Sequence, residues 1–301
     1  MDFGEPLRGE RVRLGLRTLY IVPTRFGWLW LAGAGLLQVV GIQLQRNGPL
    51  LLSFLMLALL LLALHLTHFN LMGLELRCGQ PAPGFADDLL AYPLQLRCRG
   101  RCEGLELRFG EGPISRPGAL TAGEHGLSVP WRASRRGRQQ PGRLGIRTTA
   151  PLGLFVCWTR WDPPVAQLVW PARVAGPVAE VGRQTPGAEA TAVAAATGSA
   201  DWHDVRPHRP EDSQGRLAWK LLAAGRGRHT KTFRSDAEPA PLLTVAAAVP
   251  LEQALEHLSE RIWRCQREGQ AWGLVAGGRV LAEGRGMGHR DRCLEALALW
   301  R

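Results

Sequence analysis

Two long apolar stretches near the start of the chain dominate its hydrophobic pattern. Residues 26–44 and 50–69 contain no Asp, Glu, Lys or Arg, and eleven of the twenty residues in the second stretch are leucine. A helix of about 20 residues matches the roughly 30 Å hydrocarbon core of a bilayer. Residues 45–49 between them include Asn, Gly and Pro, which favour a tight turn. The pattern therefore predicts a transmembrane helical hairpin over residues 26–69.

Small residues recur every seven positions along the first of these helices. Gly27, Ala34 and Gly41 occupy this spacing, which places them on one helix face. Small side chains let two helices approach closely within a membrane. We expect the second helix to pack against this face.

Arginines flank the hairpin on both sides but are rare in its turn. The N-terminal tail, residues 1–25, carries five arginines, the turn carries only Arg46, and Arg77, Arg97, Arg99 and Arg101 follow the second helix. Because basic flanks tend to stay in the cytoplasm, we expect both termini and the soluble domains there. A cleaved signal peptide is the alternative. It fits less well, because the first stretch starts late, lacks an obvious cleavage site and is followed at once by a second span.

Short alternating runs broken by Gly and Pro follow the hairpin. They predict strands at 74–78, 92–98, 105–109, 127–131, 144–148, 154–161 and 165–170. Seven strands at this spacing are typical of an all-β immunoglobulin-like sandwich, which we place at residues 70–171. Residues 172–200 are rich in Ala, Gly, Pro and Thr and predict a linker.

Helical and strand periodicities alternate in the C-terminal part of the chain. The predicted elements are a strand at 242–249, a helix from 250 to 265, strands at 272–276 and 279–283, and a helix at 290–300. We expect a small C-terminal α/β domain within residues 201–301. The chain as a whole is predicted to be a membrane-anchored, multi-domain protein.

The net charge of +11 suits contact with nucleic acid or with anionic lipid. Much of the charge lies in the N-terminal tail and in the run 132–147, which lacks the interleaved aromatic residues of a nucleic-acid surface. We expect this run to be a solvated hairpin loop, membrane lipid to be the partner, and nucleic-acid binding to be a weaker alternative.

Six cysteines are distributed along the chain. In a reducing compartment they are expected to be thiols rather than disulfides. The pair Cys98 and Cys102 lacks a second pair of ligands nearby, so the spacing does not indicate a zinc site.

The densest group of charged, aromatic and histidine residues lies at 201–233. Both lysines of the chain, Lys220 and Lys231, fall within it. Since all the remaining Lys or Arg positions of the chain are arginine, these two lysines suggest that an ammonium point charge is needed there.

This segment resembles the bacterial membrane-anchored family called domain of unknown function 58. The residues that match its motif are Arg206, Asp212, Trp219, Lys220, Lys231 and Phe233. Residues 23–28, 151–155 and 170–171 match further landmarks of the family in the expected order. The chain departs from the motif at His208, Glu211 and Ala224, where the family has Tyr, Gly and Arg.

The resemblance covers nearly the whole chain and implies several further properties. The C-terminal domain is similar to a truncated, degenerate von Willebrand factor type A domain, with matches at 272–274 and 293–298. Full-length domains of that type can bind a divalent metal after the first strand, but residues 242–249 offer no carboxylate or hydroxyl pair, so we expect no metal site. The family also implies the bacterial inner membrane, and as partners a MoxR-type AAA+ ATPase and a transglutaminase-like membrane protein.

The motif at 201–233 supports more than one interpretation. Ser213 with His203, His208 and either Asp204 or Asp212 has the residue types of an acyl-transfer site, but no Gly-x-Ser-x-Gly pattern surrounds the serine. A structural interpretation pairs Asp212 with Arg206 or Lys220 and places Trp202 and Trp219 in a core. A docking interpretation makes the same groups a partner surface.

We expect a non-enzymatic inner-membrane adaptor or scaffold that needs no cofactor, with a membrane-tethered hydrolase as the alternative.

Overall fold

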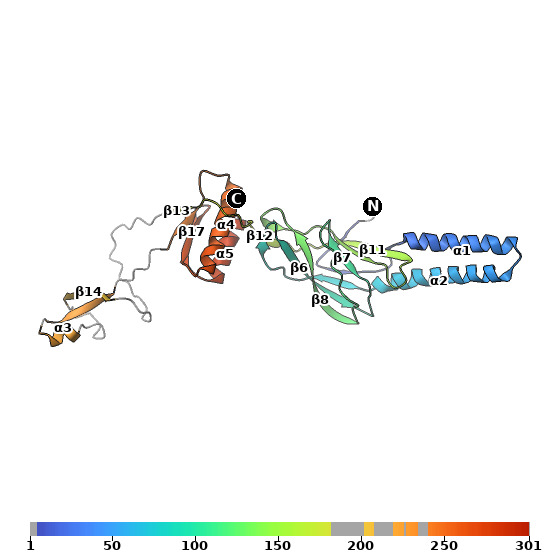
Figure 1. Ribbon diagram of the computed structural model, residues 1–301, viewed down its shortest axis with the longest axis horizontal. Coiled ribbons are helices and arrows are strands. Elements are labelled where there is room, and N and C mark those ends of the chain that lie inside the picture. The colour runs from blue at the N-terminus through green and yellow to red at the C-terminus, as the bar shows by residue number, and fades with distance from the viewer. Residues whose placement is uncertain (1–4, 182–201, 208–218, 226, 234–239, 301) are drawn as a thin grey trace.

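The computed structural model describes residues 5–181, 202–207, 219–225, 227–233 and 240–300. A helical hairpin, a β-domain and a C-terminal α/β domain follow one another along the long axis (Figure 1). This order confirms the general layout that the sequence predicts.

The two predicted apolar helices form an antiparallel pair. They are α1 (Arg25–Gln43) and α2 (Asn47–Leu71), so the turn is shorter than predicted. Gly27, Ala34 and Gly41 are the buried residues of α1, as their spacing predicts, and the hydroxyl of Ser53 donates to the carbonyl oxygen of Ala34 at 2.8 Å. Both helices are long and apolar enough to cross a membrane, by length and composition.

A threonine cap fixes the start of α1 to the β-domain. The hydroxyl of Thr24 accepts from the backbone N–H of Gly27 at 3.0 Å and donates to the carbonyl oxygen of Gly153 at 2.7 Å. One side chain therefore satisfies a free N–H of the helix end and ties the hairpin to its neighbour.

The β-domain contains two main sheets and one small one. The first sheet has the order β1 (Leu7–Arg8), β11 (Phe155–Asp162), β10 (Leu144–Thr148), β7 (Glu106–Phe109), and β3 (Tyr20–Pro23) also pairs with β11. The second has the order β2 (Arg11–Arg13), β4 (Glu75–Cys78), β6 (Leu89–Cys98), β8 (Gly123–Arg132). The small sheet has the order β5 (Gly84–Phe85), β12 (Gln167–Trp170), β9 (Gly137–Gln139).

One hydrophobic core lies between the two main sheets. Leu76 and Leu94 from one sheet and Leu107 and Ile146 from the other are at most 1% exposed. Each of the seven predicted strands is present; β10 has the predicted bounds, and the other six differ by one to four residues at one or both ends. Alternation within each strand sorts its residues between this core and the solvent, which is why the pattern could be detected from the sequence.

The N-terminal segment, predicted to be a basic tail, is part of the β-domain. β1 runs parallel to β11, β3 runs antiparallel to β11, and β2 pairs with β4. The guanidinium of Arg11 pairs with the carboxylate of Glu75 at 2.6 Å. These strands have two to four residues, too few for a pattern of period two to be recognised.

The C-terminal domain is a four-stranded sheet with both helices on one face. The sheet order is β13 (Ala179–Val181), β16 (Leu242–Thr244), β17 (Trp272–Ala276), β18 (Arg279–Gly284), and the helices are α4 (Leu251–Arg267) and α5 (Met287–Ala298). Leu243, Trp272 and Leu274 pack on the helices. On the other face Val181 and Val280 are 48% and 67% exposed. The predicted α/β unit is present, and β13 shows that the predicted linker contributes a strand.

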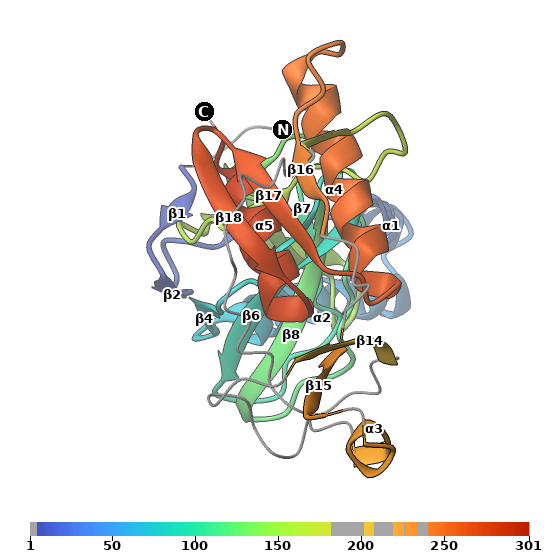
Figure 2. The same ribbon diagram turned by 90° about the vertical axis from the view of Figure 1, so that its left-hand side faces the viewer.

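The helices of this domain lie between its sheet and the β-domain (Figure 1), and in the end-on view the C-terminal domain lies in front of the β-domain (Figure 2). Phe85 and Trp170 of the β-domain belong to the same core as the C-terminal helices. The two domains therefore share a packed interface.

A third unit carries the motif at 201–233. It contains β14 (Trp202–Pro207), α3 (Trp219–Ala223) and β15 (His229–Phe233), with the two strands paired antiparallel in a sheet of their own. In Figure 1 it lies at the end of the molecule opposite the hairpin.

Candidate functional site

The structure brings the two strand segments of the motif together. In the register of β14 and β15, Arg206 lies opposite Thr230, and Lys231 lies opposite Val205. Phe233 lies opposite Trp202, Lys220 is in α3, and Asp212 lies outside the described residues.

Trp219 is the motif side chain that the structure describes, and it is 59% exposed. The structural interpretation, which placed this tryptophan in a core, is wrong for Trp219. Trp is normally highly buried, and exposed Trp is enriched at the energetic centres of interfaces. The exposure therefore favours the docking interpretation.

The residues of the hydrolase alternative do not form a described site. Ser213, His208 and Asp212 lie outside the described residues, and His203 and Asp204 are described only as backbone within β14.

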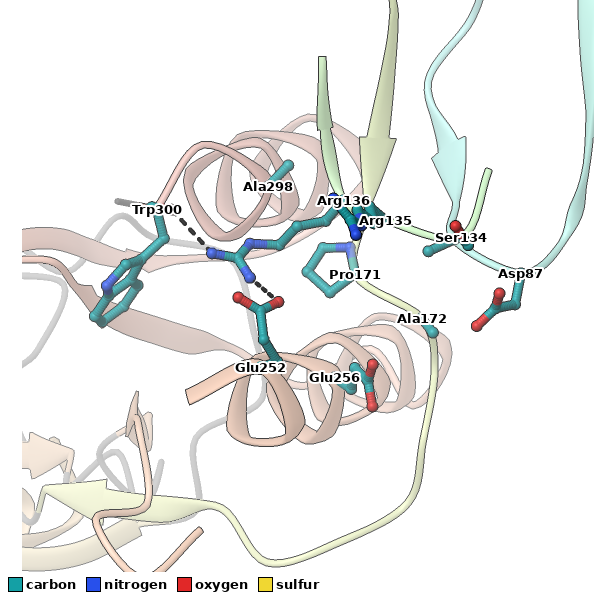
Figure 3. A pocket seen from close by; sticks show the side chains of 11 residues that line it. Asp87, Ser134, Arg135, Arg136, Pro171, Ala172, Glu252, Glu256, Ala298 and Trp300 are labelled. Carbon is teal, nitrogen blue, oxygen red and sulfur yellow. Dashed lines mark hydrogen bonds and ion pairs between the residues drawn. The ribbon is translucent and has the colours of Figure 1, made fainter. Parts of the chain in front are cut away.

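A cleft of about 490 Å³ lies where the β-domain meets the C-terminal domain (Figure 3). Its polar lining comes from Asp87, Ser134, Arg135, Arg136, Glu252 and Glu256. Three carboxylates, Asp87, Glu252 and Glu256, and two arginines supply the charges of this lining. Its chemistry is that of ion pairing between two domains.

Arg136 is the central residue of this cleft. Its guanidinium donates to the carbonyl oxygen of Trp300 at 2.9 Å and pairs with the carboxylate of Glu252, and its side chain is 14% exposed (Figure 3). Glu252 is in the first turn of α4, and Trp300 follows α5. One arginine of the β-domain therefore holds both helices of the C-terminal domain.

The prediction that the run 132–147 is a solvated hairpin loop is therefore incomplete, because part of this run lies in the junction between the two domains. It contains β9, and Arg136 is half-buried in the domain junction. Because Glu252 is 116 positions away in the sequence, no local pattern distinguishes Arg136 from the neighbouring arginines.

Stacked arginines and aromatic rings extend this junction. The guanidinium of Arg173 lies 4.7 Å from the ring centre of Phe85 and 5.1 Å from that of Trp263. Arg290 lies over the same Trp263 ring at 5.0 Å and over Trp170 at 5.9 Å. Each such contact contributes about 0.5–2 kcal/mol, more as water is excluded.

The six cysteines are free thiols in the structure. Burial raises the pKa of Cys102 to about 12 and those of Cys157 and Cys293 to about 11. Because only a thiolate is strongly nucleophilic, these three residues are inert at neutral pH.

Among the described residues, His289 is a buried histidine close to a cysteine, and its role is structural. A ring nitrogen of His289, Nε2, donates to the carbonyl oxygen of Trp272 at 2.9 Å, and the sulfur of Cys293 lies 3.6 Å from that nitrogen. Since the pKa of Cys293 is raised by burial, the pair does not form an activated thiol. Within the described parts of the chain, no three His, Cys, Asp or Glu side chains are placed to hold a metal ion.

No protein-family model, curated protein or solved structure matches the chain.

Proposed function

We propose that this protein is a non-enzymatic adaptor of the bacterial inner membrane, akin to the domain of unknown function 58 family. In this proposal the α1–α2 hairpin anchors the chain, and the soluble domains and both termini lie in the cytoplasm. The immunoglobulin-like character of the β-domain and the degenerate von Willebrand factor A character of the C-terminal domain belong to the same proposal.

The exposed surface of the hairpin supports membrane anchoring. Leu36, Leu51 and Leu61 are 65%, 69% and 60% exposed, on helices that pack mainly on each other. Fully burying a leucine is worth about 1.5–3 kcal/mol, so leaving many of them in water would be costly. An apolar surface of this extent on a soluble monomer would be exceptional.

The β-domain supports a topology in which both flanks of the hairpin lie on one side. β3 leads directly into α1 and pairs with β11, whereas β4 follows α2 and pairs with β6. The flanks therefore belong to one folded domain. The excess of arginine in both flanks over the turn supports the cytoplasm as their side.

The observation that carries the adaptor proposal is the exposed Trp219 on a unit whose strands pair only with each other among the described strands. We propose that the motif residues form the docking site. They are Arg206, Asp212, Trp219, Lys220, Lys231 and Phe233. The resemblance supports a MoxR-type AAA+ ATPase as the partner, and a transglutaminase-like membrane protein in the same assembly.

The test is affinity capture of the full chain from detergent-solubilised membranes, followed by mass spectrometry. Trp219→Ala is compared with Leu89→Ala, which removes a similarly exposed residue, 55%, from the β-domain. Recovery of the ATPase with the wild type and Leu89→Ala, and its loss with Trp219→Ala, supports docking through the motif. Equal recovery with both variants, or no ATPase with any chain, contradicts it.

A further inference from the structure

A groove of about 300 Å³ lies at the base of the hairpin, where α2 meets the β-domain. Its lining residues are Leu66, Phe69, Asn70, Arg101, Glu103, Ala150 and Pro151. Leu66 and Phe69 are 41% and 56% exposed, and the Arg101 side chain is 73% exposed. The groove thus combines an apolar wall from the helix with a cation from the β-domain.

Hydrogen bonds hold the two walls of the groove together. The side-chain amide of Asn70 donates to the carbonyl oxygen of Glu103 at 2.7 Å and accepts from the backbone N–H of Glu103 at 2.9 Å. The same amide donates to the hydroxyl of Thr148 at 3.0 Å. Because Asn70 lies in the last turn of α2 and Glu103 belongs to the β-domain, these hydrogen bonds hold the backbone of the two walls together.

The length of α2 determines where the groove lies relative to the membrane surface, and this step rests on the proposed membrane anchoring. A hydrocarbon core of roughly 30 Å takes up about 20 residues of helix. Counted from Leu50, where the apolar stretch of α2 begins, the core ends close to Phe69 and Asn70. Leu66 and Phe69 then lie at the edge of the acyl chains, and Arg101 lies in the layer of the headgroups.

We propose that this groove binds one anionic phospholipid of the membrane. The lipid phosphate lies at the guanidinium of Arg101, and the start of an acyl chain lies along Leu66 and Phe69. Arg101 also pairs with the carboxylate of Glu103. A guanidinium has five N–H donors, so a phosphate competes with this carboxylate for some of them and gains charge-assisted hydrogen bonds.

Substitution of Glu103 tests the proposal, because the proposal predicts the direction in which lipid binding changes. If Arg101 binds phosphate, removing the competing negative charge strengthens lipid binding, and removing Arg101 weakens it. If Arg101 serves only to pair with Glu103, the two substitutions act in the same direction.

The experiment uses the full chain in detergent and measures lipid binding by native mass spectrometry. Phosphatidylglycerol and phosphatidylcholine with identical acyl chains are compared. We expect Arg101→Gln to bind phosphatidylglycerol about fivefold more weakly than the wild type, the effect of one basic residue near a lipid surface. We expect Glu103→Gln to bind it more tightly. Arg138→Gln, an exposed arginine on β9, is the matched control and should bind like the wild type.

Three results would overturn the proposal: equal binding of both lipids, a loss with Arg138→Gln equal to that with Arg101→Gln, or weaker binding with Glu103→Gln. Alkaline carbonate extraction of the wild type from membranes separates this proposal from membrane anchoring. Release of the chain contradicts anchoring itself, whereas retention without a headgroup preference contradicts only the lipid site.

Discussion

Replacing Arg136 should loosen the junction between the β-domain and the C-terminal domain. Its hydrogen bond to the carbonyl oxygen of Trp300, at 2.9 Å, has a charged donor, and such bonds contribute about 1.5–3 kcal/mol. The ion pair with Glu252 adds less than about 1 kcal/mol, because the Glu252 side chain is 69% exposed. Arg136→Gln should therefore cost about 2 kcal/mol, which is about a thirtyfold increase in opening. Glu252→Gln should cost less than about 1 kcal/mol.

Hydrogen–deuterium exchange of the full chain in detergent measures this opening directly. We expect faster exchange at β9, β12 and the end of α5 in Arg136→Gln, with the hairpin and the main sheets unchanged, since local opening is confined to the weakened junction. Arg138→Gln, two positions away on β9, controls for the loss of one positive charge. The reasoning is refuted if exchange at these segments stays at the wild-type rate in Arg136→Gln. It is also refuted if Glu252→Gln opens the junction as much.

Three further predictions test other parts of the structure. Gly27→Ala places a methyl group on a backbone carbonyl oxygen of the β-domain and should lower the unfolding free energy in detergent by about 1–3 kcal/mol. In the control Gly35→Ala the added methyl group has no atom within 4 Å, so this variant should keep the stability of the wild type. Equal thermal unfolding of the two variants would contradict the close packing of Gly27 on the β-domain. A membrane-impermeant maleimide added to intact cells should label Arg46→Cys, in the turn, at once, and Ser134→Cys, in the β-domain, only after the cells are permeabilised. The reverse result would overturn the proposed cytoplasmic location of the soluble domains. Burial raises the pKa of Cys157 from 9.0 to about 11, so its contribution to stability is complete below pH 9 and is lost as the pH rises through 11. Cys157→Ala should flatten this decline in a denaturant titration, and an unchanged decline would contradict it.

The long elements could be predicted from the sequence because burial repeats within each of them. In α4 the residues Leu255, Leu258, Ile262 and Cys265 are all fully buried, and their spacing is that of one helix face. The bounds of β10 coincide with the predicted strand. In such segments the local pattern and the tertiary fold carry the same information.

The short strands could not be predicted because their stability comes from distant partners. Leu7 pairs with Trp161, and Gly137 pairs with Val169. A strand of two or three residues has no period of its own, so only the neighbouring strand defines it. The sequence therefore predicts a basic tail at residues 1–25, where the structure has three short strands, and a solvated loop where it has β9.

The candidate sites show the same limit. The role of Arg136 depends on Glu252 and Trp300, which the fold brings together from the other domain. The exposure of Trp219 runs against the usual burial of tryptophan, so the residue type alone favours a core. The density of charged and aromatic residues distinguishes the segment 201–233 in the sequence, but only the structure separates a surface residue from a buried one.

The N-terminal strands also decide between a permanent hairpin and a removable leader. Cleavage after α1 would remove β1, β2 and β3, which pair with strands of both main sheets. It would also remove two hydrogen-bond acceptors: the carbonyl oxygen of Gly9, which accepts from the buried indole N–H of Trp161, and the carbonyl oxygen of Thr18, which accepts from the hydroxyl of Thr159. Each lost partner of a buried donor costs about 1–3 kcal/mol. A β-domain built in this way needs the residues before α1, so the signal-peptide alternative conflicts with the fold. Because one domain holds both flanks, any bilayer that the hairpin enters has them on the same side.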